Sequence, residues 1–402
     1  MTTQLFNTAH FVQAMRDNGY KNAAYALAEL MDNSIQAGAS QVELLCGEKE
    51  FIDQRRRMRI DQIAVLDNGA GMNAEVMKVA LQFGNSTHLK ASEQTGMGRF
   101  GMGLPSASIS QCKRVDVWSW QNGVDSALHT YLDLDKITSR EQRGIPEPVQ
   151  SEIPDVWRKV GTSWGKSGTL VVWSKIDRAM WRTAQAVITN SEFIIGRMYR
   201  KFIESKSVAI RLVQFDIEQP MPTAKDKLAQ PNDPGYLMER TSCPAPFNDQ
   251  AMFEVWGHES TYEVNFEGGN HLIKMEFSMA KREARENSPG GKVAGSLPHG
   301  AHAGRNIGTS VVRAGRELDL SQVWVLSEQT ERWWGVKIEF PPALDKLFGV
   351  TNNKQSAHSF TDLGTIDFDE ELKGGKTITA LRDEMLEDGD PRAPLMDIAH
   401  HI

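Results

Sequence analysis

Apolar residues in the first third of the chain recur with two different periods. Across residues 23–36 they return every three or four positions, which predicts a helix with one apolar side. Across residues 60–66 they form a short run that predicts a strand entering a core. Asp67 stands where that strand ends, and a small-residue helix is expected after Pro105.

The same patterns continue to about residue 390 and predict an α/β protein. A long amphipathic stretch, Trp181 to Glu204, separates two groups of strands. We expect a mixed, largely antiparallel sheet with helices on one face, and then a second α/β domain. Strands are expected at 41–46, 114–120, 127–134, 169–173, 208–215, 251–256, 271–277, 306–313 and 334–340, and loops at 220–246 and 287–305.

Two polar side chains share one face of the first predicted helix. Glu29 and Asn33 stand four residues apart, so both project the same way. A glutamate there can take a proton from an attacking water, and an asparagine carbonyl is a hard oxygen ligand suited to Mg²⁺ on phosphates. Taken alone, the pair is far more often an ordinary solvated helix face.

The strand end at Asp67 has a different chemistry. Its carboxylate can accept a hydrogen bond from an exocyclic amine such as that of adenine. Asn68-Gly69 indicates a turn, and Gly69 and Gly71 let backbone approach a ligand closely. Met72, which follows the turn, is included in this candidate site. An Asx turn without a ligand is the alternative.

A glycine-dense loop, Gly98-Arg99-Phe100-Gly101-Met102-Gly103, precedes the small-residue helix. Backbone amides of such a loop at a helix N-terminus form an anion site, for which phosphates are the natural occupants. Its spacing is neither a dinucleotide-binding fingerprint nor a Walker loop. A mobile lid without a ligand is the alternative.

In this order the three segments resemble the motifs of the GHKL ATPases, named for gyrase, the ninety-kilodalton heat-shock chaperone, histidine kinases and MutL. Gly168-Thr169 resembles a later element of the same superfamily. The resemblance implies a Bergerat-type α/β sandwich that binds ATP and Mg²⁺. It implies Glu29 as general base, Asn33 as magnesium ligand, Asp67 with Thr169 at the adenine, Gly98 to Gly103 at the phosphates, and Phe83 to Thr95 as the lid.

A string in the second half narrows the resemblance to MORC-type ATPases of prokaryotes. Asn353-Lys354-Gln355 is similar to the string that MORC ATPases carry in a transducer-like second domain. The resemblance implies that Lys354 reaches the γ-phosphate, where an ammonium stabilises developing charge. The expected division is an ATP-binding domain at residues 1–180, a transducer-like domain at 181–363 and a tail at 364–402 with a helix at 378–386.

Composition restricts the partners and the cellular location that we expect for the protein. The net charge of −7 argues against constitutive nucleic-acid binding over the whole surface. Cys46, Cys112 and Cys243 lack metal spacing and read as reduced thiols. Neither a signal peptide nor an apolar run of about 18 residues is present, so we expect a cytoplasmic protein without a membrane partner. His299 and His302 fall in an expected mobile loop, since further metal ligands are not evident.

The function expected from the resemblance is an ATP-hydrolysing switch that forms a homodimer on binding ATP. DNA, including foreign DNA in defence, and an operon-encoded protein are candidate partners. Basic clusters at 55–57, 197–201 and 281–285 could contact phosphate backbone or be solvated faces. The alternative is a nucleotide-gated interaction or chaperone-like module with little turnover, against which Glu29 argues because a pure sensor needs no base.

Overall fold

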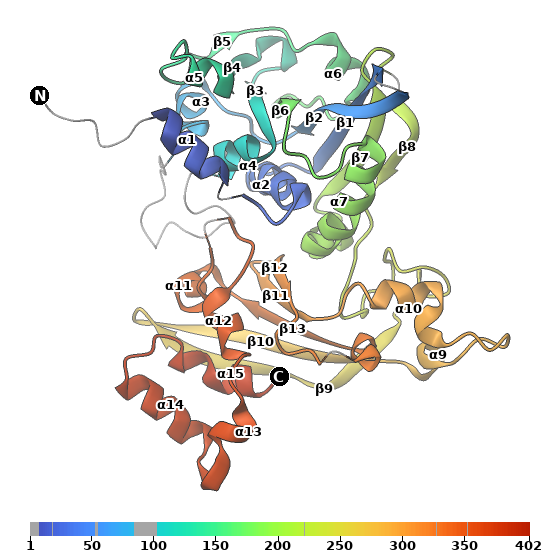
Figure 1. The fold of residues 1–402 in the computed structure, drawn as a ribbon, viewed down its shortest axis with the longest axis vertical. Helices are drawn as coiled ribbons and strands as arrows, with labels where there is room; N and C mark the ends of the chain where they lie inside the picture. The colour runs from blue at the N-terminus through green and yellow to red at the C-terminus, as the bar shows by residue number, and fades with distance from the viewer. Residues whose placement is uncertain are drawn as a thin grey trace, which may run out of the picture. The chain divides into compact units, whose positions relative to one another are not determined.

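The computed structural model describes residues 8–17, 19–52, 55–83, 103–220, 222–326, 328–351 and 353–402. The chain forms two compact units (Figure 1). Unit 1 comprises residues 1–195 and 205–229, and unit 2 comprises residues 196–204 and 230–402. The domain boundaries expected after residues 180 and 363 stay predictions.

Unit 1 is built on an eight-stranded sheet in the order β5-β4-β3-β6-β2-β1-β7-β8. Strands β1 and β7 pair in parallel, whereas the other neighbours are antiparallel. The mixed, largely antiparallel sheet is therefore confirmed. The strands are β1 Gln41–Ile52, β2 Arg56–Asp67, β3 Cys112–Trp120, β4 Leu128–Asp133, β5 Val149–Gln150, β6 Gly168–Ile176, β7 Ala209–Asp216 and β8 Pro222–Leu228.

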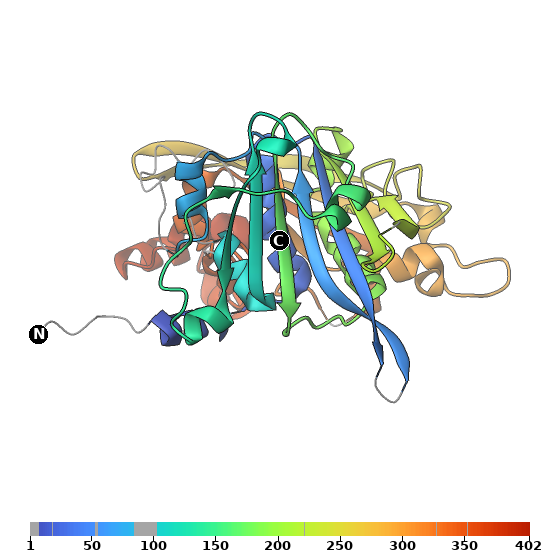
Figure 2. The ribbon, with the colours of Figure 1, turned by 90° about the horizontal axis from the view of Figure 1, so that it is seen from above.

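Helices α1, α2, α4 and α7 lie on one side of this sheet, and α6 lies on the other (Figures 1 and 2). Alternation along β2 explains the layers, because Ala64 and Leu66 pack with Trp157 of α6 while Asp67 contacts α2. The helices are α1 Thr8–Asp17, α2 Ala23–Gln36, α3 Ala74–Ala80, α4 Gly103–Gln111, α5 Leu134–Thr138, α6 Asp155–Val160 and α7 Ala184–Met198, with the 3₁₀ helix Val124–Ser126.

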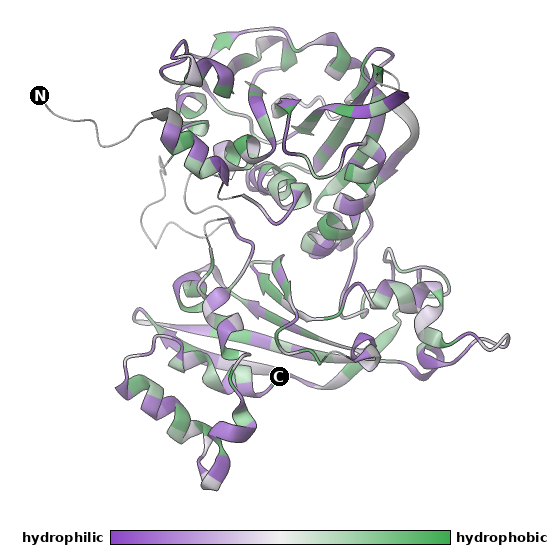
Figure 3. Cartoon of the chain, in the orientation of Figure 1, coloured by the Kyte–Doolittle hydropathy of each residue, from purple (hydrophilic) through white to green (hydrophobic). Residues whose placement is uncertain are grey.

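Unit 2 has a five-stranded sheet in the order β12-β11-β13-β10-β9, with β11 and β13 parallel. A buried apolar cluster that includes Ile273, Ile338, Phe348 and Phe360 joins the sheet to the C-terminal helices. Hydrophilic and hydrophobic segments alternate along the strands and helices of each unit (Figure 3). The strands are β9 Phe253–Phe266, β10 Gly269–Ala280, β11 Thr309–Arg313, β12 Arg316–Ser321 and β13 Trp334–Phe340.

Short helices make up much of the remainder of unit 2. The α-helices are α8 Arg200–Glu204, α9 Arg282–Arg285, α10 Pro298–Ala303, α11 Asp345–Phe348, α12 His358–Leu363, α13 Phe368–Glu371, α14 Ile378–Glu387 and α15 Met396–His400. The 3₁₀ helices are Ala294–Ser296, Gln329–Trp333, Pro342–Leu344, Lys373–Gly375 and Ala393–Leu395. The tail helix expected at 378–386 is thus confirmed as α14.

Both expected loops were wrong in part. The segment 220–246 contains β8, which is the polar edge strand of its sheet and therefore lacks an apolar alternation. The segment 287–305 contains α10, in which His299 and His302 are buried. His299 Nε2 lies 3.0 Å from the Ala284 carbonyl, and His302 lies 2.8 Å from the Tyr236 hydroxyl. These histidines are packing residues rather than parts of a mobile loop.

Three sequence expectations about composition can be compared with the described residues. In these ranges no helix has both the length and the apolar character needed to cross a membrane, and no group of three metal-ligating side chains occurs. The three cysteines are free and buried. Burial raises the pKa of the Cys243 thiol to about 12.

Candidate functional site

Helix α2 carries the first motif and begins where it was predicted. The side chain of Asn22 caps its N-terminus by accepting a hydrogen bond from the Ala24 amide at 3.0 Å. Glu29 is 1% exposed, whereas Asn33, one turn further on, is exposed. The two side chains of this motif therefore differ in environment: a buried carboxylate and a carboxamide that solvent reaches.

The start of α4 approaches the Glu29 carboxylate directly. A Cβ atom on Gly103 would lie only 2.7 Å from Glu29 Oε2, so a side chain at this position would displace the carboxylate. The first and third motifs thus meet at Gly103, the first residue of α4. Gly98, Arg99, Phe100, Gly101 and Met102 lie outside the described residues, as does the expected lid beyond Phe83.

Asp67, the last residue of β2, is 4% exposed and is held by neutral donors. Its Oδ2 accepts a hydrogen bond from Ser34 Oγ at 2.8 Å, and its Oδ1 accepts one from the Gly69 amide at 2.9 Å. Burial raises the pKa of Asp67, although hydrogen bonds from Gly69, Ser34 and Thr169 oppose the shift. Such a carboxylate is suited to accept a hydrogen bond from a ligand.

The turn after Asp67 fits closely between α2 and β3. Gly71 has φ +67°, and a Cβ there would lie 2.0 Å from the Trp120 carbonyl oxygen. The Ala70 amide donates to the Ala37 carbonyl at the end of α2, at 2.8 Å. A Cβ on Gly69 would lie 2.9 Å from the Ala37 Cβ. Both glycines are therefore required by the packing of this turn.

Sheet register brings the fourth motif to the same place. Asp67 on β2 pairs with Thr169 on β6, and Thr169 pairs with Ser119 on β3. The Ser119 hydroxyl lies 2.9 Å from Thr169 Oγ1 and accepts a hydrogen bond from the Met72 amide at 2.8 Å. Thr169 and Met72 are thus linked to Asp67 through β2, β3 and β6.

Sequence reasoning missed two serines at this site. Ser34 follows Asn33 on α2 and donates to Asp67, and Ser119 joins Met72 to Thr169. Ser119 carries no local signal, because only the pairing of β3 with β6 places it beside Thr169. Ser34 offered no distinct signal either, because it follows Asp32 and Asn33 in a short polar run.

Lys354 belongs to unit 2 and follows α11. It is 6% exposed and adopts φ 49°. Its carbonyl accepts a hydrogen bond from Arg316 Nη1 at 2.9 Å, and its amide donates to the Thr351 carbonyl at 2.9 Å. The backbone at Lys354 is thus fixed within unit 2, and the role expected for its ammonium stays a prediction.

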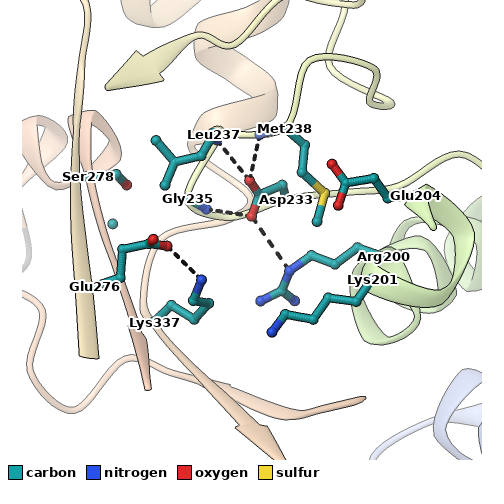
Figure 4. Close-up of a pocket in the computed structure, with 11 residues that line it drawn as sticks. Arg200, Lys201, Glu204, Asp233, Gly235, Leu237, Met238, Glu276, Ser278 and Lys337 are labelled. Atoms are coloured by element: carbon teal, nitrogen blue, oxygen red, sulfur yellow. Dashed lines mark hydrogen bonds and ion pairs between the residues drawn. The ribbon is translucent and has the colours of Figure 1, made fainter. Parts of the chain in front are cut away.

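Unit 2 also contains a cavity of about 420 Å³ with a charged lining (Figure 4). Its charges are largely paired within the protein. Lys337 Nζ lies 2.6 Å from Glu276, and Arg200 Nε lies 3.5 Å from Asp233. Asp233 also accepts hydrogen bonds from the amides of Gly235, Leu237 and Met238. Polar groups that are paired in this way are typical of a network that stabilises the fold. The motif residues Glu29, Asp67 and Thr169 belong to unit 1 and do not line this cavity.

Sequence similarity agrees with the region that holds the motifs. Residues 20–162 match the family described as "Histidine kinase-, DNA gyrase B-, and HSP90-like ATPase". ATPase MORC2B of Mus musculus is 31% identical over 124 residues, and ATPase MORC2 of Homo sapiens is 36% identical over 124 residues. Each match covers 31% of this chain but only 11% of the relative.

One solved structure aligns with this chain at low sequence identity. It is described as the "N terminal domain of a DNA repair protein" and aligns with 93% of this chain and 98% of that chain. Its TM-score is 0.47, and its sequence is 13% identical.

Proposed function

Because the chain carries a GHKL-type ATPase domain similar to those of MORC proteins, we propose that it binds ATP and hydrolyses it to ADP and phosphate. The observation that carries the proposal is the buried carboxylate of Asp67 at the end of β2, joined to α2 by Ser34. The turn with Gly69 and Gly71 follows Asp67 directly, and Thr169 pairs with Asp67 on the neighbouring strand.

The proposed adenine subsite is formed by Asp67, with Met72 and Thr169 beside it. An exocyclic amine supplies a hydrogen-bond donor, and Asp67 lacks a cationic partner among the residues that the structure describes. A ligand donor would therefore satisfy an acceptor whose ionised form burial disfavours. This chemistry favours adenine over guanine, which presents a carbonyl oxygen at the corresponding ring position.

Glu29 and Asn33 are proposed to act at the phosphate end. Asn33 presents its carboxamide to solvent one turn from Glu29, so it can hold Mg²⁺ through a hard oxygen. The ion, when bound, neutralises charge on the phosphates. Glu29 would accept a proton from the attacking water, and its burial against Gly103 fixes its position.

The remaining site assignments are extensions of the same proposal. Gly98, Arg99, Phe100, Gly101, Met102 and Gly103 would supply backbone amides to the phosphates. Lys354 would contact the γ-phosphate and make the position of the second domain depend on the nucleotide. Replacing Lys354 with alanine should then reduce turnover and leave most of the ATP affinity, whereas unchanged turnover would remove Lys354 from the site.

We further propose that ATP drives formation of a homodimer and that hydrolysis releases it. In this proposal ATP binding creates the surface that the second copy contacts, so dimerisation selects the ATP-bound state. DNA is the proposed client, with defence against foreign DNA as the setting and an operon-encoded protein as a candidate partner. Similarity to ATPase MORC2 and MORC2B supports the ATPase part of this proposal, and the DNA client extends it from the resemblance to MORC-type ATPases. The second candidate is a nucleotide-gated interaction or chaperone-like module with little turnover.

Phosphate release and ATP binding, measured on the same preparations, test the enzyme proposal. Glu29→Gln should lower turnover by roughly 10²- to 10⁴-fold and change the ATP dissociation constant only a few-fold. Glu75→Gln is the matched control, because Glu75 is an exposed glutamate on α3. ATP binding without phosphate release from the unmodified chain would favour the second candidate, and absence of binding would contradict both.

Size-exclusion chromatography tests the dimer. The Glu29→Gln chain with ATP, and the unmodified chain with a non-hydrolysable analogue, should elute as dimers. A monomer in every nucleotide state would contradict the ATP-driven homodimer while leaving the ATPase proposal intact.

A further inference from the structure

Strands β1 and β2 continue beyond the sheet that they help to form. β7 pairs with β1 only as far as Glu48, and β6 pairs with β2 only from Ile63 to Asp67. Residues 49–52 and 56–59 therefore pair with each other and with no third strand in the part of the chain that the structure describes. We call these residues the ribbon, and Figure 2 shows it extending past the other strands.

The ribbon is firmly attached at its base. The Glu48 carboxylate is buried, accepting hydrogen bonds from the Ala184 amide at 2.8 Å and from Gln214 Nε2 at 2.7 Å. The Ile60 amide donates to the Arg182 carbonyl at 3.0 Å. A bulge between Gly47 and Glu48 falls at the same level, and bulges bend and twist a strand pair. The base thus sets the direction in which the ribbon extends.

Antiparallel register sorts the ribbon's side chains onto two faces. Directly opposed residues share a face, and successive residues alternate. Lys49 pairs with Arg59 and Phe51 pairs with Arg57, which defines a basic face of four residues. The opposite face carries the pairs Glu50 with Met58 and Ile52 with Arg56.

Charge is divided unequally between these faces. The basic face holds three cations and no ribbon carboxylate, whereas on the opposite face Arg56 lies 3.9 Å from Glu50. Arg57 and Arg59 form no ion pair with any residue in the described ranges. Lys49 lies 3.5 Å from Glu218, but both side chains are about half exposed, so the pair contributes little.

We propose that the basic face of the ribbon binds double-stranded DNA through its phosphate backbone. Guanidinium groups bind phosphate through paired hydrogen bonds, and the major groove admits a two-stranded β-ribbon. Phe51 is 51% exposed on the same face and supplies an apolar contact to the sugars or bases. The inference names a DNA-contacting surface for the proposed function, and it does not depend on ATP hydrolysis.

The distribution of apolar residues disfavours a membrane as the partner. Phe51 belongs to the basic face, while Ile52 and Met58, which are also exposed, belong to the opposite face. A segment that lies in a bilayer interface gathers its apolar side chains on one uncharged face, whereas the face with Ile52 and Met58 also carries Glu50 and Arg56. The ribbon instead gathers its cations, which complements a polyanion.

Fluorescence anisotropy of a labelled DNA duplex over a salt series tests the proposal with a matched pair of variants. Arg57→Gln and Arg56→Gln remove the same charge from adjacent residues on opposite faces. Arg57→Gln should weaken binding roughly 5- to 10-fold near 0.1 M salt and reduce the salt slope by about 1. Arg57→Gln/Arg59→Gln should reduce the slope by about 2, and Arg56→Gln should stay within roughly 2-fold of the unmodified chain.

The outcomes separate this inference from the proposed function. Equal losses in Arg56→Gln and Arg57→Gln, or tighter binding to RNA, anionic vesicles or an acidic peptide than to the duplex, would overturn the inference. So would an unmodified chain that hydrolyses ATP but does not bind DNA, and the ATPase proposal would then stand. A chain that binds DNA through Arg57 without hydrolysing ATP would refute the ATPase proposal alone. Circular dichroism checks that each variant is folded.

Discussion

Asp67 in unit 1 and Glu317 in unit 2 are both buried carboxylates, yet their surroundings shift their pKa values in opposite directions. Asp67 is held by a hydroxyl and backbone amides, and its burial raises its pKa. Glu317 lies 2.5 Å from Arg197 Nε and 2.7 Å from Arg200 Nη1, and it accepts a hydrogen bond from Ser310. Burial also acts to raise the pKa of Glu317, but the two arginines and Ser310 lower it overall.

The difference separates a carboxylate that holds a fold from one that is available to a ligand. The pairs that Glu317 makes join the end of α7 and α8 to β11 and β12. Asp67 keeps an acceptor that no described cation neutralises, at the start of a turn that Gly69 and Gly71 allow to pack closely against Ala37 and Trp120. Perturbed carboxylates without an internal counter-charge are candidates for binding sites. The two residues should therefore respond oppositely to loss of their charge.

The largest effect is expected at Glu317. Glu317→Gln leaves Arg197 and Arg200 buried without their counter-charge, and it should lower the free energy of unfolding of unit 2 by about 3–5 kcal/mol. Hydrogen exchange of the β11 and β12 amides in urea would measure this loss. Glu339→Gln is the matched control, since its partner Lys201 is half-buried and the change should be below about 1 kcal/mol. Equal effects would remove the contrast with Asp67.

His302 extends the comparison to a basic side chain that burial keeps neutral. Burial, and the nearby charge of Arg305, lower the pKa of His302 to about 4. In the unfolded chain His302 has a pKa near 6.5, so it binds a proton below that pH, whereas in the folded chain it stays neutral until the pH approaches 4. The free energy of unfolding therefore falls as the pH drops from about 6.5 toward 4. At pH 5 the loss should be about 2 kcal/mol relative to neutral pH. His302→Gln, measured by urea unfolding, should lose this dependence; an unchanged pH profile would contradict the assignment.

Asp67→Asn should impair binding without destabilising the protein. A carboxylate whose folded pKa is raised favours folding at low pH and opposes it once ionised, so the amide should leave the free energy of unfolding near neutral pH unchanged or higher. ATP affinity should fall roughly 10- to 30-fold, about 1.5–2 kcal/mol, and preference for ATP over GTP should shrink. Calorimetric titration with both nucleotides measures this, and an unaltered ATP/GTP ratio would exclude Asp67 from the adenine subsite.

Apolar periodicity correctly predicted those elements whose pattern of apolar residues is set within the element itself. Residues 23–36 form α2 with the predicted bounds, because the apolar recurrence and the Asn22 cap are both local, although almost the whole helix and not one stripe alone is buried. It failed for β8, an edge strand whose Lys225, Asp226 and Lys227 follow no alternation. It also failed for α10, where glycines and a proline suggested a loop although contacts with Tyr236 and Ala284 hold both histidines.

For the candidate site, motifs predicted the groups that are proposed to contact a ligand, and they missed the serines that hold those groups in place. Glu29, Asp67 and Gly103 could be predicted because their residue types and their spacing within the motifs indicate a chemical role. Ser34 and Ser119 were not, because a serine acquires its meaning only from the strand or helix packed against it.

Ser34 therefore offers the smallest and most specific test of how Asp67 is held. Ser34→Ala removes one hydrogen bond to Asp67 Oδ2, so the pKa of Asp67 should rise further and ATP affinity should fall roughly 5-fold, about 1 kcal/mol. Titrations across acidic pH should show affinity beginning to fall at a higher pH than in the unmodified chain. Ser191→Ala is the control, because the Ser191 hydroxyl on α7 is buried without a hydrogen-bond partner among the described residues. If both variants bind ATP alike, the hydrogen bond from Ser34 to Asp67 does not contribute to ATP binding, and Ser34 only packs α2 against β2.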